Sequence, residues 1–374
     1  MRKLRNIIVL LIIAGSFWYF YGDAFTHSGI SGVYDEIRYD LNRMRNNPTV
    51  NHTIDHINKE IDLLFKRMRE ETKVEPDPTI PESPELDEPT EQVFSIHNIE
   101  LNDSRDMVEQ HVGSHQRSSL NEYGVDWTAY HDHYHNFILV AYDENNLVAG
   151  LYTNQNLVTS TKGINFESSR SNILAELGEP LEYLRKGYVN YRLQDTEEYD
   201  MFRIHDDYVT IFYDLHQNNT VTGIQIIRGD LEEQKETYFA DPSGQLKTGF
   251  EYQLFDITNA ARVKHDLSIL SWDERVRETA YKHSNDMAEN NYFGHINLDG
   301  LSPFDRLTED AISYRTAGEN LAAGQISSVF AHEGLMNSLG HRENKLNDAF
   351  ESLGIGVAFN EESQPYYTEK YLAE

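Results

Sequence analysis

The chain has 374 residues, an apolar content of 39%, a formal net charge of −30 at pH 7 and no cysteine. This length and apolar content allow two folded domains with real cores. The excess of carboxylates argues against a nucleic-acid partner, because phosphate contacts need Lys and Arg, and the lack of cysteine excludes disulfides, thiol nucleophiles and Cys-ligated zinc.

Residues 1–22 have the pattern of an export segment. Arg2, Lys3 and Arg5 precede a mostly apolar run from Ile7 to Tyr21. Basic residues stay on the cytosolic side, so the rest of the chain is expected outside the cell. As a helix the run spans roughly 22 Å, which suits a signal peptide, whereas its aromatic end favours an uncleaved anchor. The sequence therefore predicts C-terminal domains that are extracellular, either attached to the cell membrane or secreted.

Residues 23–73 are predicted to form a helical stalk, followed by an acidic, proline-rich linker at 74–92. The linker alternates prolines with acids, a composition that predicts an extended spacer. Within the stalk, apolar residues recur at spacings of four and three, as in a coiled coil. The stalk could therefore self-associate or pack on its own upstream segment. These apolar residues are Val50, Ile54, Ile57, Ile61, Leu64 and Met68.

Residues 93–230 contain an internal repeat, with an offset of 65 at its start that grows to 71 and 73 later. Each copy predicts a strand, a short helix capped by Ser, a glycine turn and strands joined by Asn-rich hairpins. Two copies predict one α+β domain with pseudo-twofold symmetry. The matching segments are Ile99–Leu101, Ser104–Arg105 and Gly113 with Ile164–Phe166, Ser169–Arg170 and Gly178, then Val140–Asp143 and Val148–Leu151 with Ile211–Asp214 and Val221–Ile224.

The C-terminal segment, residues 248–374, is expected to form a second domain. Apolar spacing predicts two helices between residues 250 and 290 and another over 327–338. A buried strand over 353–359 should pair with the end of the chain through a turn. The polar stretch 232–247 lacks core-forming periodicity, so the two domains are expected to fold separately.

Three short runs in this segment carry polar residues among glycines: YFGHINLDG at 292–300, AGENLAAG at 317–324 and LMNSLGHREN at 335–344. They contain His295, Glu319 and His341. Such composition is typical of a polar site on loops, and AGENLAAG is expected to be a loop that opens a short helix. His341 is expected immediately beyond a helix terminus, where its side chain can point into a cleft.

In order, spacing and flanking apolar pattern, residues 248–374 resemble the CAP superfamily (cysteine-rich secretory, antigen 5 and pathogenesis-related 1 proteins) in its bacterial SCP-like form. The repeat region resembles the CAP-associated domain that precedes some of these. The resemblance implies an α/β/α sandwich and a central cavity lined by two His and two Glu. His295, Glu319 and His341 match three of these positions, and Glu333 and Ser338 are both candidates for the fourth.

This candidate site allows more than one chemistry. His295 and His341 could bind Zn²⁺ or another divalent ion with Glu319, or the trio could be a hydrogen-bonded network without metal. Ser338 could act as a nucleophile with His341, but no oxyanion donor is identifiable. The sequence favours an envelope binding module for a lipid, glycan or protein ligand rather than an enzyme. The alternatives are a metal-assisted hydrolase and a structural cell-surface scaffold.

Overall fold

The computed structural model describes residues 81–193 and 196–374, and residues 81–374 form one compact unit. The predicted anchor, the stalk and the start of the linker lie outside the described residues. Within the described residues, no helix has the length and apolar character needed to cross a membrane. The rest of the linker has no regular secondary structure and is bound to the following domain, where the Glu100 carboxylate accepts hydrogen bonds from the backbone N–H groups of Thr90 and Glu91.

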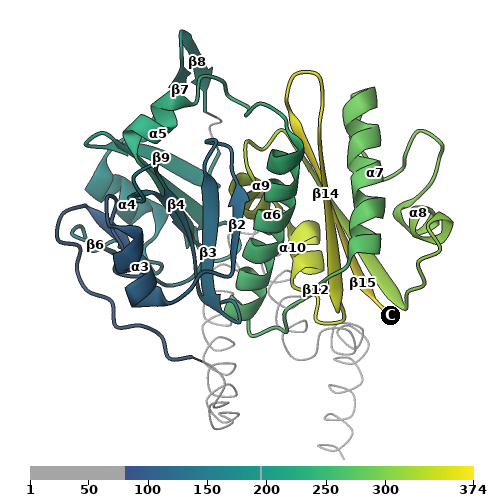
Figure 1. Ribbon diagram of the computed structural model, residues 1–374, viewed down its shortest axis with the longest axis horizontal. Coiled ribbons are helices and arrows are strands. Elements are labelled where there is room, and N and C mark those ends of the chain that lie inside the picture. The colour runs from purple at the N-terminus through teal and green to yellow at the C-terminus, as the bar shows by residue number, and fades with distance from the viewer. Residues whose placement is uncertain (1–80, 194–195) are drawn as a thin grey trace, which may run out of the picture. The chain divides into compact units, whose positions relative to one another are not determined.

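The region that contains the repeat folds as an α+β domain. Its main sheet has seven antiparallel strands among the described residues, in the order β2-β3-β4-β5-β11-β10-β9. β1 and β6 form a small separate ladder, and β7 and β8 form a hairpin that projects from the domain (Figure 1). The elements are β1 (Phe94–Ile96), α3 (Arg105–Val112), β2 (Arg117–Leu120), β3 (Asp126–Asp132), β4 (His135–Tyr142), β5 (Val148–Thr153), β6 (Val158–Ser160), α4 (Arg170–Leu177), β7 (Tyr183–Lys186), β8 (Val189–Arg192), β9 (Tyr199–Ile204), β10 (Asp207–Asp214), β11 (Thr220–Ile227) and α5 (Gly229–Gln234).

The same order of elements occurs twice in this domain, at the positions of the two sequence copies. Helices α3 and α4 are each eight residues long, and the side chains of Ser104 and Ser169 cap their N-termini. Equivalent strands pair with each other, β1 with β6 and β5 with β11. In the second pair Tyr152 lies opposite Gln225, and these residues are separated by the offset of 73 found between the copies at this point. The pseudo-twofold axis therefore passes through the centre of the β5–β11 ladder.

The C-terminal domain is the expected α/β/α sandwich. Its sheet has four strands among the described residues, in the order β12-β14-β15-β13. Helices α6, α9 and α10 cover one face, and α7 and α8 cover the other (Figure 1). The predicted pairing of β14 with β15 is confirmed. The elements are α6 (Gly244–Lys264), β12 (Ser271–Trp272), α7 (Glu274–Asn290), α8 (Pro303–Glu309), β13 (Thr316–Ala323), α9 (Ser328–Asn337), α10 (Leu339–Lys345), β14 (Ser352–Phe359) and β15 (Pro365–Ala373).

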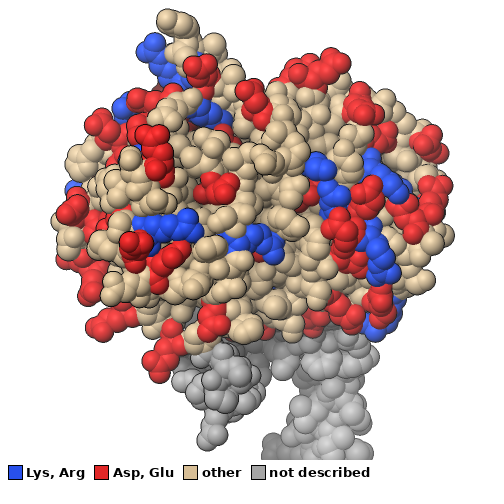
Figure 2. All heavy atoms as spheres, in the orientation of Figure 1, with Lys and Arg blue, Asp and Glu red and all other residues tan. Residues whose placement is uncertain are grey.

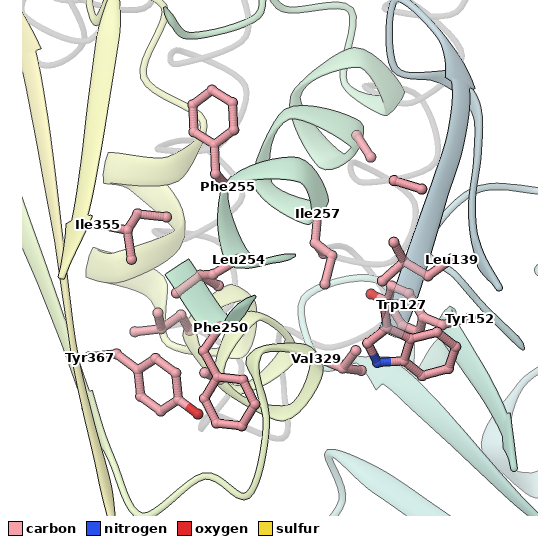
Figure 3. Close-up of a cluster of buried hydrophobic side chains, with 14 of the residues drawn as sticks. Trp127, Leu139, Tyr152, Phe250, Leu254, Phe255, Ile257, Val329, Ile355 and Tyr367 are labelled. Atoms are coloured by element: carbon pink, nitrogen blue, oxygen red, sulfur yellow. The ribbon is translucent and has the colours of Figure 1, made fainter. Parts of the chain in front are cut away.

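One hydrophobic cluster spans both domains. Alternation along the seven-stranded sheet sends one set of side chains toward α3 and α4 and the other set, which includes Trp127 and Leu139, toward the second domain. There they share a core with Leu254 and Ile257 of α6 and Val329 of α9 (Figure 3). Helices α6 and α9 therefore lie between the two sheets, and the domains have a common core where the sequence suggested separate ones.

Candidate functional site

Glu319 lies in the strand β13 and not on a loop, so this part of the sequence prediction was wrong. The backbone of Thr316–Ala323 pairs with β15 along its whole length. The run AGENLAAG has few residues with strand propensity, and a strand forms here because β15 supplies the backbone partners. Strand β13 consequently holds the Glu319 side chain at a fixed position beneath the surface.

Three cationic or hydrogen-bonding side chains surround the buried Glu319 carboxylate. Nδ1 of His295 lies 3.0 Å from Oε1, Nη2 of Arg306 donates to both oxygens at 2.9 and 2.8 Å, and Nζ of Lys370 lies 2.7 Å from Oε2. Burial alone would raise the pKa of Glu319, but the hydrogen bond from His295 and the charges of Lys370 and Arg306 hold it at about 2. Glu319 is therefore ionised throughout the physiological pH range.

His295 lies on the loop between α7 and α8, with nearly half of its side chain exposed to solvent (48%). Arg306 Nη1 donates to the carbonyl oxygen of His295 at 2.8 Å and to that of Leu301 at 3.0 Å. On the α7 side, the buried His283 contacts the carbonyl oxygen of Gly294 through Nε2 at 3.0 Å. The loop is thus fixed on both sides of His295, while the imidazole itself remains accessible.

His341 follows α9 as predicted, and it lies in a second short helix, α10, that the sequence analysis did not anticipate. Its Nδ1 is 2.8 Å from Oγ of the exposed Ser338, and its carbonyl oxygen accepts a hydrogen bond from Asn320 Nδ2 at 3.0 Å. Burial lowers the pKa of His341, the Glu369 carboxylate opposes this effect, and the charge of His295 adds to it. The two imidazoles therefore interact electrostatically.

A buried ionic network that sequence reasoning missed lies under His341. Asn320 Nδ2 donates to Glu369 Oε2 at 3.0 Å, and the Tyr371 hydroxyl donates to the same atom at 2.7 Å. Lys345 pairs with the other oxygen of Glu369 at 2.5 Å, and both side chains are fully buried. The sequence signal for this network was the pair of charged residues inside the otherwise apolar closing strand YYTEKYLA, because a buried charge requires a partner.

Glu333, one of the two candidates for the fourth cavity position, lies at the interface between the domains. Its Oε1 accepts a hydrogen bond from the Tyr152 hydroxyl at 2.8 Å, and a Cβ atom at Gly223 would come within 2.4 Å of the same oxygen. Burial raises the pKa of Glu333 to about 7. Of the two candidates, the structure brings Ser338 and not Glu333 into contact with His341.

The residues present do not fit a metal centre of two imidazoles and Glu319. Both Glu319 oxygens already accept from Arg306, Lys370 and His295, so two cationic side chains stand where a metal ion would need to bind. In the described part of the chain, no group of three or more His, Asp and Glu side chains could hold an ion. Nδ1 of His295 faces Glu319, and Nδ1 of His341 faces Ser338. Only the Nε2 atom of each of these two rings could therefore donate an electron pair to a metal ion. A two-imidazole metal site stays a prediction.

Large apolar side chains are exposed on the same segments that carry the two imidazoles. Three are on the α7–α8 loop, one is on α8 and one begins α10. Each of these residues is roughly half exposed to solvent, so these segments present apolar surface together with the two imidazole groups. The residues are Phe293 (57% exposed), Ile296 (54%), Leu298 (64%), Phe304 (47%) and Leu339 (47%).

Comparison with known proteins identifies both domains. Residues 255–371 match the cysteine-rich secretory protein family, and residues 101–238 match the CAP-associated N-terminal family. Over 128 residues the chain is 41% identical to the uncharacterized membrane protein YlbC of Bacillus subtilis (strain 168), covering 34% of this chain and 36% of that protein. Over 127 residues it is 38% identical to the uncharacterized protein YkwD of the same organism, covering 34% and 48%. The matches thus span less than half of either relative.

Solved structures show the same fold over both domains. An extracellular protein containing a SCP domain from Bacillus anthracis aligns with a TM-score of 0.63 and 24% identity, over 79% of this chain and 100% of that one. A cysteine-rich secretory protein from Staphylococcus aureus aligns with a TM-score of 0.55 and 15% identity, over 73% and 91%. With the two family matches, the chain contains a CAP domain of the SCP-like type over residues 255–371, preceded by a CAP-associated N-terminal domain over residues 101–238.

Proposed function

We propose that this protein is a binding module of the cell envelope that holds a lipid-like amphiphile on the surface formed by His295 and His341. The observation that carries the proposal is the exposed apolar side chains on the segments that bear these imidazoles. An apolar tail would cover the apolar side chains, at about 25 cal/mol per Å² of buried area. The Nε2 atoms of the imidazoles would contact a polar head group.

The charge of the protein favours a neutral or zwitterionic head group. Acidic side chains are spread over the face drawn in Figure 2, and the net charge is −30. An anionic amphiphile would be repelled by this field, although the ionised Glu319 itself is neutralised locally by Arg306 and Lys370. A phosphocholine head group carries one positive and one negative charge, so its net charge is zero and it avoids that repulsion.

We also propose an extracytoplasmic location, with the N-terminal segment in the cell membrane. Support comes from the basic N-terminus followed by an apolar run, from a relative named a membrane protein and from a structural neighbour described as extracellular. Protease added to intact cells should digest the chain beyond about Gly22 and leave the anchor in the membrane fraction. Recovery of intact protein from the cytosol would contradict this location.

The binding proposal can be tested with residues 81–374, which form a compact unit and correspond in extent to the whole chain of a solved relative. Lysophosphatidylcholine, kept below its critical micelle concentration, is titrated into the protein in a calorimeter. The double variant Phe293→Ser and Leu298→Ser should weaken binding at least about tenfold, because each side chain contributes on the order of 1.5 kcal/mol when covered.

Ile269→Ser provides the matched control, because Ile269 is also exposed (43%) but lies on the loop between α6 and β12. It should leave the affinity unchanged. An equal loss of affinity in the double variant and in Ile269→Ser would mean that lysophosphatidylcholine binds exposed apolar residues without a specific site. No binding to the unmodified protein would remove the proposal and favour a structural scaffold.

A hydrolase is the second candidate, because Ser338 and His341 are in hydrogen-bond contact and Ser338 is exposed. In such an enzyme Ser338 would be the nucleophile and His341 the base. A fluorophosphonate probe should then label Ser338, and the label should disappear in His341→Ala. An unlabelled Ser338 at high probe concentration would leave the contact with a purely structural role.

A further inference from the structure

The β10–β11 hairpin of the CAP-associated domain contacts the CAP domain at the end of α9. Asn337, the last residue of α9, binds this hairpin with both atoms of its side-chain amide. Its Oδ1 accepts from the backbone N–H of Leu215 at 3.0 Å, and its Nδ2 donates to the carbonyl oxygen of Tyr213 at 2.9 Å. Nε2 of His216 lies 3.0 Å from the carbonyl oxygen of Asn337.

A second contact joins the hairpin to α10. Asp214 organises the turn, because its Oδ1 accepts from the backbone N–H of His216 and its carbonyl oxygen accepts from that of Asn219. The other carboxylate oxygen accepts a hydrogen bond from Arg342 Nη2 at 2.9 Å. The two side chains of this ion pair are only 8% and 11% exposed, so solvent screens it little.

Comparison of the two repeats shows that this contact belongs to the second copy. In the first copy, the equivalent Asp143 also organises its turn, but its ion-pair partner is Arg228, within the same domain. The offset between the copies grows from 71 before the hairpin to 73 after it. The second hairpin is therefore longer by two residues, and the segment 215–217 that contains the extra length supplies both Leu215 and His216 to the contact with Asn337.

We infer that this longer hairpin is a positioning element of the candidate site, which fixes the α9–α10 junction and thereby the direction of the His341 imidazole. The hairpin holds Asn337 and Arg342, and between these two residues lie only Ser338, Leu339, Gly340 and His341. The CAP-associated domain thus orients a residue of the ligand surface that the CAP domain carries, and its removal would release the α9–α10 junction from the hairpin. Only the ligand-binding consequence rests on the proposed function.

The test compares Asn337→Ala with Gln253→Ala in the full-length chain. Gln253 is the matched control, because its side-chain amide also bonds backbone carbonyls across the interface, those of Ser119 and Leu120, but from α6. The rate at which diethyl pyrocarbonate modifies His341 is measured against pH by peptide mass spectrometry, since only a neutral imidazole reacts. Melting temperatures and affinity for lysophosphatidylcholine are measured in parallel.

Asn337→Ala should raise the rate at which diethyl pyrocarbonate modifies His341 across the pH range, because the junction loosens and the part-buried ring becomes more accessible. It should also weaken lysophosphatidylcholine binding several-fold. Gln253→Ala should lower the melting temperature without changing the His341 profile. A second variant that deletes Leu215 and His216, which shortens the hairpin to the length of the first copy, should reproduce the effect of Asn337→Ala.

An unchanged His341 profile in both hairpin variants, with melting temperatures lowered as in Gln253→Ala, would overturn the inference. The modification profile needs no ligand, so it tests the positioning role even if the amphiphile does not bind. Failure of the unmodified protein to bind lysophosphatidylcholine would instead refute the proposed function and leave the positioning role intact.

Discussion

Replacement of Glu333 by Gln should change how the stability of the protein depends on pH. The Glu333 carboxyl is buried between the domains and accepts a hydrogen bond from Tyr152. Burial raises its pKa, a hydrogen bond from Tyr152 and the charge of Lys264 oppose the rise, and the resulting pKa is about 7. Gln has the same shape and keeps an acceptor for the Tyr152 hydroxyl, but it cannot ionise.

The direction of this pH dependence follows from how many protons the folded and unfolded states bind. The folded state holds the Glu333 proton up to pH of about 7, whereas the unfolded chain releases it near the ordinary value of 4.5. The stability that this group contributes is therefore complete below pH 4.5 and is lost as pH rises through 7. Because one pKa unit corresponds to about 1.4 kcal/mol, the rise from 4.5 to about 7 amounts to about 3 kcal/mol.

The assay is urea unfolding of the unmodified protein and of Glu333→Gln at several pH values from 4.5 to 8. The free energy of unfolding of the variant, relative to the unmodified protein, should increase by up to about 3 kcal/mol across this range. Glu122 is another buried carboxyl, and burial raises its pKa to about 7. Because it is present in both proteins, its contribution to the difference in free energy between them cancels. Glu343→Gln, which changes an exposed carboxyl of α10, should show no such trend. A difference that does not vary with pH, or that decreases, would refute the reasoning.

Three further predictions concern the candidate site and the interface between the domains. Lys370→Met leaves Glu319 with one buried cation fewer, and urea unfolding should show a loss of about 3 kcal/mol; an unchanged free energy would mean that Arg306 alone neutralises the carboxylate. Zn²⁺ titrated by calorimetry should bind weakly at the candidate site, where, among the described residues, only Nε2 of His295 and Nε2 of His341 face no protein partner, and this weak affinity should be lost in His341→Ala. Stoichiometric binding at micromolar protein would show that further ligands complete the site. Fragments 81–230 and 248–374, expressed separately, should aggregate or unfold without cooperativity on heating, since each exposes half of a shared core; cooperative unfolding of both would contradict the common core.

Local sequence signals predicted several elements well. The constant offset of 65 predicted the two Ser-capped helices, because a cap requires only a polar side chain at the helix start. The apolar spacing also predicted α9, and the turn before the end of the chain predicted the pairing of β14 with β15. In each of these elements the residues that determine the structure are neighbours in the sequence.

The parts that could not be predicted depend on contacts between distant segments. Glu319 is in a strand only because β15 lies beside it, and its charge is balanced by Arg306 from α8 and Lys370 from β15. No local pattern pairs these three residues. The same holds for the interface, where Glu333 meets Tyr152 from 181 residues away.

The most direct test of the central claim is to find where an amphiphile binds. A photoreactive lysophosphatidylcholine is bound to residues 81–374, cross-linked by light, and the labelled peptides are identified by mass spectrometry. The proposed function predicts labels concentrated in 291–304 and 335–345, the segments that carry His295 and His341, and competition by unlabelled lipid. Labels distributed over the exposed surface, or gathered on the projecting β7–β8 hairpin, would contradict the assignment of the ligand to the CAP domain.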